Sequence, residues 1–212
     1  MQYNVPGVRV PDSKIARDVT ELIRDTESEL LFHHSMRVYF WAALKGKHQN
    51  LKFDPELLYT ASMFHDIGLT KDYGNSQLRF EVDGANAARD FLHSRGIAET
   101  DLEKVWLAIA LHTTPGIPEH MHPEIALLQA GTAMDVVGHG FGDFSDDERK
   151  AVIAACPRER AFKHEIIDAF YEGMRHRPDS TFGTFNDDVL SFKDPHFKRA
   201  DLCTIIRSSR WE

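Results

Sequence analysis

The stretch that decides the fold runs Leu58-Tyr59-Thr60-Ala61-Ser62-Met63-Phe64-His65-Asp66-Ile67-Gly68-Leu69. A histidine and an aspartate stand side by side at the end of an apolar run, and both side chains are common metal ligands. Neighbouring side chains on a helix diverge by about 100°, so both can reach one ion only if it lies beside the helix. The other ligands must then come from other helices, and the chain offers His34 upstream and Asp135 downstream.

Composition limits the class of protein. A chain of 212 residues is long enough for one domain with a substantial core and no disulfides. Its two cysteines, Cys156 and Cys203, lie far apart, which predicts reduced thiols in a cytoplasmic protein. A net charge of −8 argues against nucleic acid as a partner. No apolar run approaches the ~20 residues of a membrane span, and the first residues lack a signal-peptide pattern. We therefore expect a small-molecule substrate and no membrane or nucleic-acid partner, and a homo-oligomer is compatible with this composition.

Hydrophobic spacing and capping signals predict helices along most of the chain. We expect them over about 13–31, 33–46, 55–66, 84–95, 105–112, 123–137, 146–155 and 158–174, with loops and short helices beyond. Expected caps are Asp12 or Ser13, Asp54 before Pro55, Asp83, and capping boxes over 100–103 and 145–148. No strand signal, repeat or linker is found. The prediction is an all-α, single-domain helical bundle over 1–212, with a motif core at about 20–140 and residues 145–212 packed on it.

Four candidate ligands lie on three separate predicted helices in apolar surroundings: His34, the pair His65 and Asp66, and Asp135. A buried Asp135 without a partner would be unfavourable, and one cation would satisfy all four side chains. Two imidazoles and two carboxylates suit Zn, Mn, Fe, Co or Ni better than Ca or Mg. Taken one at a time, each histidine is as well explained by a hydrogen bond in the core, and Asp135 by a capping role. Their joint order favours the metal.

The order His34, His65-Asp66, Asp135 in an all-α chain resembles the HD-domain superfamily of metal-dependent hydrolases, over most of residues 20–140. The sequence around these residues is similar to the cyanamide hydratase-like branch of that superfamily. The matching segments are residues 34–39, 63–69, 79–85 and 108–113. The resemblance implies one divalent transition-metal ion per chain, with zinc favoured, held by His34, His65, Asp66 and Asp135.

The same resemblance implies catalytic roles for His112 and Glu81, which match branch motifs, together with Asp66. His112 ends an apolar helix before the loop Thr113-Thr114-Pro115-Gly116, a place that suits a pocket wall. The alternative for His112 is an interaction with its helix dipole. Charged Lys71 and Arg79 follow the His-Asp pair and are candidate substrate-binding residues, although such loop residues are usually solvated.

The number of metal ions is a separate question. Some HD enzymes bind a second ion through two additional histidines, and His112 with His120 or His122 could supply them here. Only 23 residues separate His112 from Asp135, which leaves little room for another ligand-bearing helix. We therefore expect one ion, and we expect His112 to act on the substrate.

The resemblance implies that a metal-bound hydroxide attacks a small electrophile, in the cyanamide hydratase-like case a nitrile carbon that becomes a urea. His112 has the intrinsic pKa range to supply the proton that the nitrogen needs, and a small pocket suffices. A first alternative is a phosphohydrolase acting on a nucleotide or other phosphomonoester, with Arg79 or Lys71 holding the phosphate. Further alternatives are a di-iron oxygenase and a non-catalytic module that retains the metal.

Overall fold

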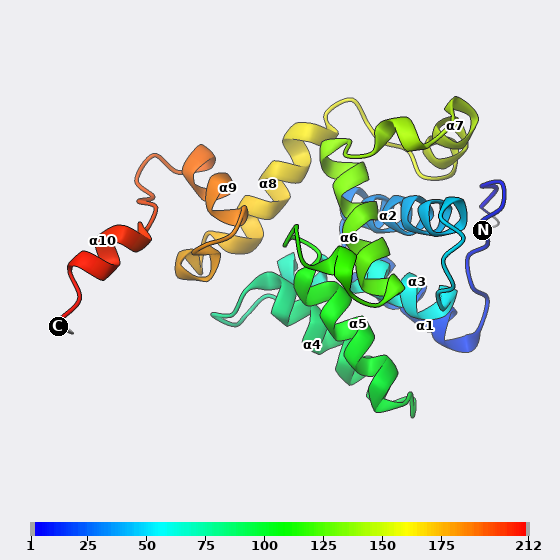
Figure 1. The fold of residues 1–212 in the computed structure, drawn as a ribbon, viewed down its shortest axis with the longest axis horizontal. Coiled ribbons are helices and arrows are strands. Elements are labelled where there is room, and N and C mark those ends of the chain that lie inside the picture. The colour runs from blue at the N-terminus through cyan, green and yellow to red at the C-terminus, as the bar shows by residue number, and fades with distance from the viewer. Residues whose placement is uncertain (1–2, 211–212) are drawn as a thin grey trace.

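The structure is a computed structural model that describes residues 3–210, and this part of the chain contains helices and no strand (Figure 1). The α-helices are α1 (Lys14–Thr26), α2 (Glu29–His48), α3 (Pro55–Phe64), α4 (Phe80–His93), α5 (Glu99–Leu111), α6 (Pro123–Val137), α7 (Asp146–Ala155), α8 (Phe162–Met174), α9 (Asn186–Lys193) and α10 (Leu202–Arg207). Four 3₁₀ turns complete the list: η1 (Ile67–Leu69), η2 (Pro118–His120), η3 (Phe141–Asp143) and η4 (Pro178–Thr181). The predicted all-α fold is confirmed. Within residues 3–210, none of the helices combines the length and apolar content that a bilayer crossing requires.

Helix α2 is the centre of the core, because nearly every side chain from Leu31 to Gly46 is buried. A helix that is apolar around its whole circumference must be covered on all sides. Helices α3 and α6 pack along it, and α1, α7 and α8 add further contacts. The approach of α6 depends on Gly131, where an added Cβ would come within 2.5 Å of the Val38 carbonyl oxygen. Asp135 lies one turn further along α6 and therefore faces α2 as well.

The boundary between α1 and α2 differs from the prediction. The helix expected to run to Leu31 ends at Thr26, and α2 begins at Glu29, not near His33. Ser28 is the physical reason, since its side chain accepts a hydrogen bond from the Leu31 amide and caps the new helix.

Helix α4 also begins earlier than predicted, at Phe80 rather than after Asp83. Asp83 is therefore not a cap but a buried residue of the first turn. Its carboxylate accepts hydrogen bonds from Ser76 and from the buried guanidinium of Arg177. The side chain joins α4 to the end of α8.

Helices α5 and α8 also begin elsewhere than expected. Helix α5 begins at Glu99 after Ala98, so the capping box expected over residues 100–103 does not form. Helix α8 begins at Phe162 rather than near residue 158. The predicted caps at Asp54 and Ser145 are confirmed, and Ser145 forms the complete capping box with Glu148.

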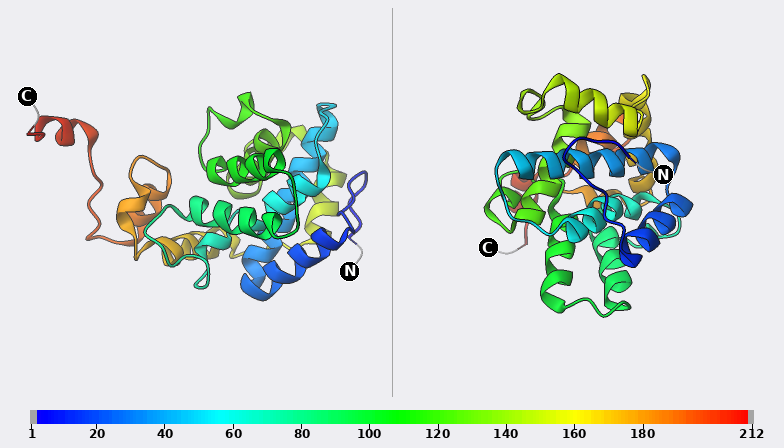
Figure 2. Two further views of the ribbon diagram at one scale, coloured as in Figure 1. Left: turned by 90° about the horizontal axis from the view of Figure 1, so that it is seen from below. Right: turned by 90° about the vertical axis from the view of Figure 1, so that its right-hand side faces the viewer.

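Helices α8 and α9 share a second, smaller apolar cluster with η1 and α4. Beyond α9 the chain leaves the body, and α10 stands apart from the other helices in Figure 1 and in the left-hand view of Figure 2. Residues 198–210 are exposed throughout. The expected packing of residues 145–212 on the motif core therefore does not extend to this last segment.

Candidate metal centre

The His-Asp pair lies just beyond α3, not on it as expected. Helix α3 ends at Phe64, His65 is its C-cap, and Asp66 precedes the turn η1. The turn lies against the start of α4, where an added Cβ at Gly68 would come within 2.0 Å of the Phe80 carbonyl oxygen. Only glycine fits this approach, so the backbone after the pair is held in one place.

Three of the four predicted ligands come together in the core. Ligand atoms of His34, His65 and Asp66 all lie within 4.8 Å of one another. The Nε2 atoms of the two histidines are 3.2 Å apart, and Asp66 Oδ2 lies 3.5 Å from Nε2 of His34 and 3.2 Å from Nε2 of His65. All three side chains are at most 1% exposed. The α2 histidine and the pair after α3 thus meet as the sequence order predicts.

The hydrogen bonds of the Nδ1 atoms determine the tautomers of these imidazoles and of His112. Nδ1 of His65 lies 2.7 Å from the backbone carbonyl oxygen three residues earlier, and Nδ1 of His112 makes the same contact at 2.6 Å. Nδ1 of His34 lies 2.7 Å from Asp135 Oδ2. These oxygens can only accept, so each Nδ1 carries the proton and donates it, which leaves a lone pair on Nε2 in the neutral ring. Burial lowers the pKa of His34, against the pull of Asp135 and Asp66, and so favours that neutral form.

Asp66 has no ordinary partner for its charge. Among the described residues, no group donates a hydrogen bond to either carboxylate oxygen. Burial opposes ionisation of Asp66, and positive charge on the surrounding rings of His65, His112 and His34 would hold its pKa well below the usual range. With neutral rings, a bound cation has to supply that positive charge. Lone pairs on neighbouring Nε2 atoms beside an unpartnered carboxylate repel one another, and a cation among them removes the repulsion. The donor set therefore fits a metal ion.

Asp135 lies elsewhere than expected. We expected it as a ligand, but its Oδ1 accepts from Arg37 Nε at 2.8 Å and Trp41 Nε1 at 3.0 Å. Its Oδ2 accepts from Arg37 Nη2 at 2.9 Å as well as from Nδ1 of His34. Burial opposes ionisation, yet His34 and Arg37 hold the pKa of Asp135 well below normal. The carboxylate thus holds the ring edge of His34 that faces away from Asp66.

Arg37 and Trp41 were missed by the sequence reasoning, although a signal was present. They follow His34 by three and seven residues and therefore share its face of the helix. A carboxylate that orients a ligating histidine from behind is a recurrent feature of metal sites. Arg37 in turn holds the Asp135 carboxylate through a bidentate pair of hydrogen bonds.

His112 lies next to the cluster, on the Asp66 side, although it is not one of the three side chains whose ligand atoms are all within 4.8 Å of one another. From the sequence, we expected it to act on the substrate. It is the C-cap of α5, and its Nε2 lies 3.6 Å from Asp66 Oδ1. Its ring lies edge-on to that of His65, with 4.9 Å between the centroids. His120 and His122 are exposed and belong to no cluster of metal-binding side chains within residues 3–210.

The other predicted site residues form a separate network. Glu81 is fully buried, and its Oε1 accepts hydrogen bonds from Arg79, Thr113 and Asn186. Burial opposes ionisation of Glu81, but Arg79, His112 and Thr113 together lower its pKa. Lys71 is exposed. Asn186 lies more than a hundred residues from Glu81, so no local pattern could have identified it.

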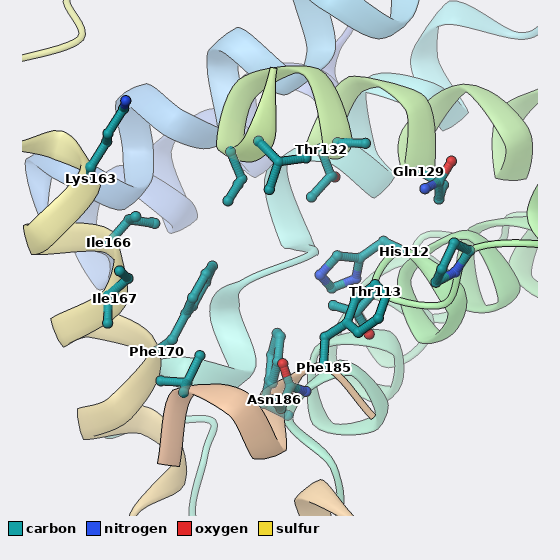
Figure 3. A pocket seen from close by; sticks show the side chains of 16 residues that line it. His112, Thr113, Gln129, Thr132, Lys163, Ile166, Ile167, Phe170, Phe185 and Asn186 are labelled. Atoms are coloured by element: carbon teal, nitrogen blue, oxygen red, sulfur yellow. The ribbon is translucent and has the colours of Figure 1, made fainter. Parts of the chain in front are cut away.

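A cavity of about 450 Å³ adjoins this region and is bordered by His112 (Figure 3). Side chains of α4, α6, α8 and α9 and of the loop after α5 line it, and most of them are apolar. Neither Lys71 nor Arg79 is among the lining residues. His112 borders the cavity, whereas His34, His65 and Asp66 are not among its lining residues.

Comparison with known families gives one match. The model of the family described as HD domain matches residues 31–156, more than half of the 212-residue chain. This range contains His34, His65, Asp66, His112 and Asp135. Helices α8 and α9, which form one wall of the cavity, lie beyond it. A search of curated proteins found no match.

Proposed function

The chain belongs to the HD-domain family, and we propose on this basis that it is a metal-dependent hydrolase or hydratase with its ion held by His34, His65, Asp66 and His112. One observation carries the proposal. Three imidazoles, each with Nδ1 engaged behind it, turn Nε2 toward a buried carboxylate that accepts no hydrogen bond within the described chain.

The donor set narrows the choice of metal. Three imidazoles and one carboxylate suit zinc first, with Fe, Mn, Co and Ni as further candidates. A divalent ion bound there would lower the pKa of a water molecule toward about 7 and polarise an electrophilic substrate. An ion held by four protein donors would still have to accept a water molecule or a substrate group, which zinc and the other candidate metals can do. We expect one ion per chain.

The residues around the cluster define where a substrate can react. His34, His65 and Asp66 are closed off from solvent, and His112 alone of the four borders the cavity. A substrate must therefore bring its reacting group to the His112 end. The Nε2 atom of His112 faces Asp66 at 3.6 Å, so in this proposal it is a ligand of the ion and does not deliver a proton to the substrate.

Addition of water to a nitrile, the cyanamide hydratase-like reaction, is the specific activity that we propose first. The nitrile is uncharged, and this agrees with the absence of a lysine or arginine side chain from the His112 end of the cavity, where the proposed ion would be the one cation. The phosphohydrolase alternative has less support, because Arg79 is paired with Glu81 and Lys71 lies outside the cavity. The di-iron alternative has less support as well, because His120 and His122 are exposed.

Metal analysis of variants tests the proposal. Replacing His65 or Asp66 with Ala should remove most of the metal from protein purified without chelator, and lower the melting temperature of the metal-loaded protein. Undiminished metal content in both variants would reject the site. Two ions per chain at saturation would revive the di-iron alternative.

Activity assays then separate the reactions. Urea release from cyanamide, compared with phosphate release from a panel of nucleoside monophosphates, distinguishes hydration from phosphate hydrolysis. A metal-loaded protein that turns over neither class would favour the non-catalytic module.

A further inference from the structure

The cavity beside His112 has two unlike ends. Figure 3 shows His112, Thr113 and Asn186 at one end, and Ile167 and Phe170 of α8 across the cavity from them. The wall that α8 and α9 supply belongs to the part of the chain beyond the family match, which ends at residue 156. The ligand preference that this wall imposes therefore comes from residues outside the part of the chain that matches the HD-domain family.

The volume is the first guide to the ligand. A pocket for cyanamide alone would need to hold three heavy atoms, and our sequence reasoning expected a small pocket. The cavity instead measures about 450 Å³. Pockets of about 300–1,000 Å³ typically enclose drug-sized molecules, mostly through apolar contacts. The ligand should therefore carry a hydrocarbon body in addition to its reacting group.

Charge is the second guide. Lys163 is the one lysine or arginine among the lining residues, its side chain is exposed, and it lies at the end opposite His112 (Figure 3). Apart from the proposed ion, an anionic group next to His112 would meet no cationic side chain among the lining residues, and its charge would be desolvated with only that ion as partner. This favours an uncharged reacting end of the ligand.

Hydrogen-bonding capacity is the third guide. Thr113 donates its hydroxyl proton to Glu81 and accepts from Arg79 Nη2 at 3.3 Å, so its oxygen has one acceptor site left for a ligand. Asn186 donates one amide hydrogen to the same Glu81 oxygen and keeps its carbonyl oxygen as an acceptor, together with its second amide hydrogen as a donor. Acceptors at the polar end match a ligand that offers N–H groups.

The geometry points to a neutral amphiphilic substrate with an N–H-bearing head, such as an amide, a urea or a substituted cyanamide, and a hydrocarbon tail against α8 and α9. The head lies beside His112, so the inference rests on the proposed function for the identity of the reacting end. Glu81 acts here as a positioning residue, because it orients both acceptors without lining the cavity.

Binding of a chain-length series tests this inference without reliance on turnover. Primary alkyl amides from propanamide to nonanamide, with alkyl phosphates of the same lengths, would be titrated calorimetrically into the full-length protein, with and without zinc. Each added methylene should tighten amide binding about threefold to fourfold until the cavity is full. The phosphates should bind more weakly at every length.

Two variants place the tail. Ala133→Phe on α6 and Val189→Phe on α9 fill the cavity from different walls and should abolish the chain-length dependence, with metal content unchanged. Ala154→Phe, an exposed position on α7, is the matched control and should behave as the parent. The inference would be overturned by any of three results: an amide affinity that does not change with chain length, tighter binding of the phosphates than of the amides, or unchanged binding in both cavity variants. Chain-length-dependent amide binding to a protein that holds no metal would uphold the inference and refute the proposed function.

Discussion

Replacing Asp135 with Asn separates a ligand from a residue that orients a ligand. The two carboxylate oxygens accept four hydrogen bonds, two from Arg37 and one each from Trp41 and His34. An amide has one oxygen and one NH₂ group. If its oxygen keeps the Arg37 Nε and Trp41 bonds, its NH₂ group faces the His34 Nδ1 proton and Arg37 Nη2, which are donors.

The variant should therefore weaken metal binding without removing a ligand. His34 can relieve the clash by moving its proton to Nε2, but this replaces the lone pair in the cluster with an N–H group. Loss of such a supporting partner typically costs about 10–100-fold in metal affinity. The free energy of unfolding of the metal-free protein should fall by about 3–5 kcal/mol, because Arg37 stays charged and buried without its carboxylate.

Competition with a chromophoric chelator measures the affinity, and urea unfolding in excess chelator measures the stability. At saturating metal, Asp135→Asn should still bind one ion per chain. Trp41→Phe is the matched control, since it removes one of the four hydrogen bonds and leaves the His34 partner in place. Its affinity should stay within a few-fold of the parent. Failure of Asp135→Asn to bind metal at saturation would show that Asp135 is a ligand after all, and an unchanged affinity would show that it does not act on His34.

Three other perturbations test the surroundings of the site. Gly131→Val should lower the free energy of unfolding by about 1–3 kcal/mol through overpacking, and with it the melting temperature, because its Cβ would come within 2.5 Å of a backbone oxygen of α2. Arg177→Met should destabilise the protein to urea by about 3–5 kcal/mol, since it strands a buried carboxylate and frees the carbonyl after the His-Asp pair. Burial raises the pKa of Cys156 from 9.0 to about 12, so a thiol reagent at pH 8 should modify Cys203 alone in the native protein and both thiols in denaturant. The folded-state pKa is the higher one, so this thiol's contribution to stability should be lost as the pH rises from 9.0 to about 12.

The order of residues along the chain was enough to identify the core of the site. His34 lies on a helix buried all round, and His65 and Asp66 follow an apolar run, so the three could be expected to meet. The role of Asp135 could not be predicted in the same way. A sequence shows that an aspartate faces α2 but not which edge of an imidazole it meets. That depends on how closely Gly131 lets the helices approach.

The predicted helix boundaries were wrong where two local sequence signals suggested different starting residues. The apolar spacing of α1 continues through Leu30 as if the helix did not stop, so the capping serine at position 28 was passed over. The reverse happened at residues 100–103, where a capping-box pattern fits the sequence but the helix already begins at Glu99. At α2 the local cap at Ser28 sets the boundary, whereas α5 begins one residue before Thr100 without a side-chain cap.

The position of His112 could have been inferred from that of His65. Each is the C-cap of its helix, and each donates Nδ1–H to the backbone carbonyl three residues earlier. The last carbonyls of a helix have no partner within the helix, so a histidine placed there finds an acceptor that fixes both its proton and the direction of its ring. The helix must also end there so that the ring can turn inward. Gly68 and Pro115 are the helix-breaking residues that follow His65 and His112. A histidine that ends an apolar helix just before such a break is therefore a candidate ligand in its own right, and by this criterion His112 belongs with His65 rather than with the substrate.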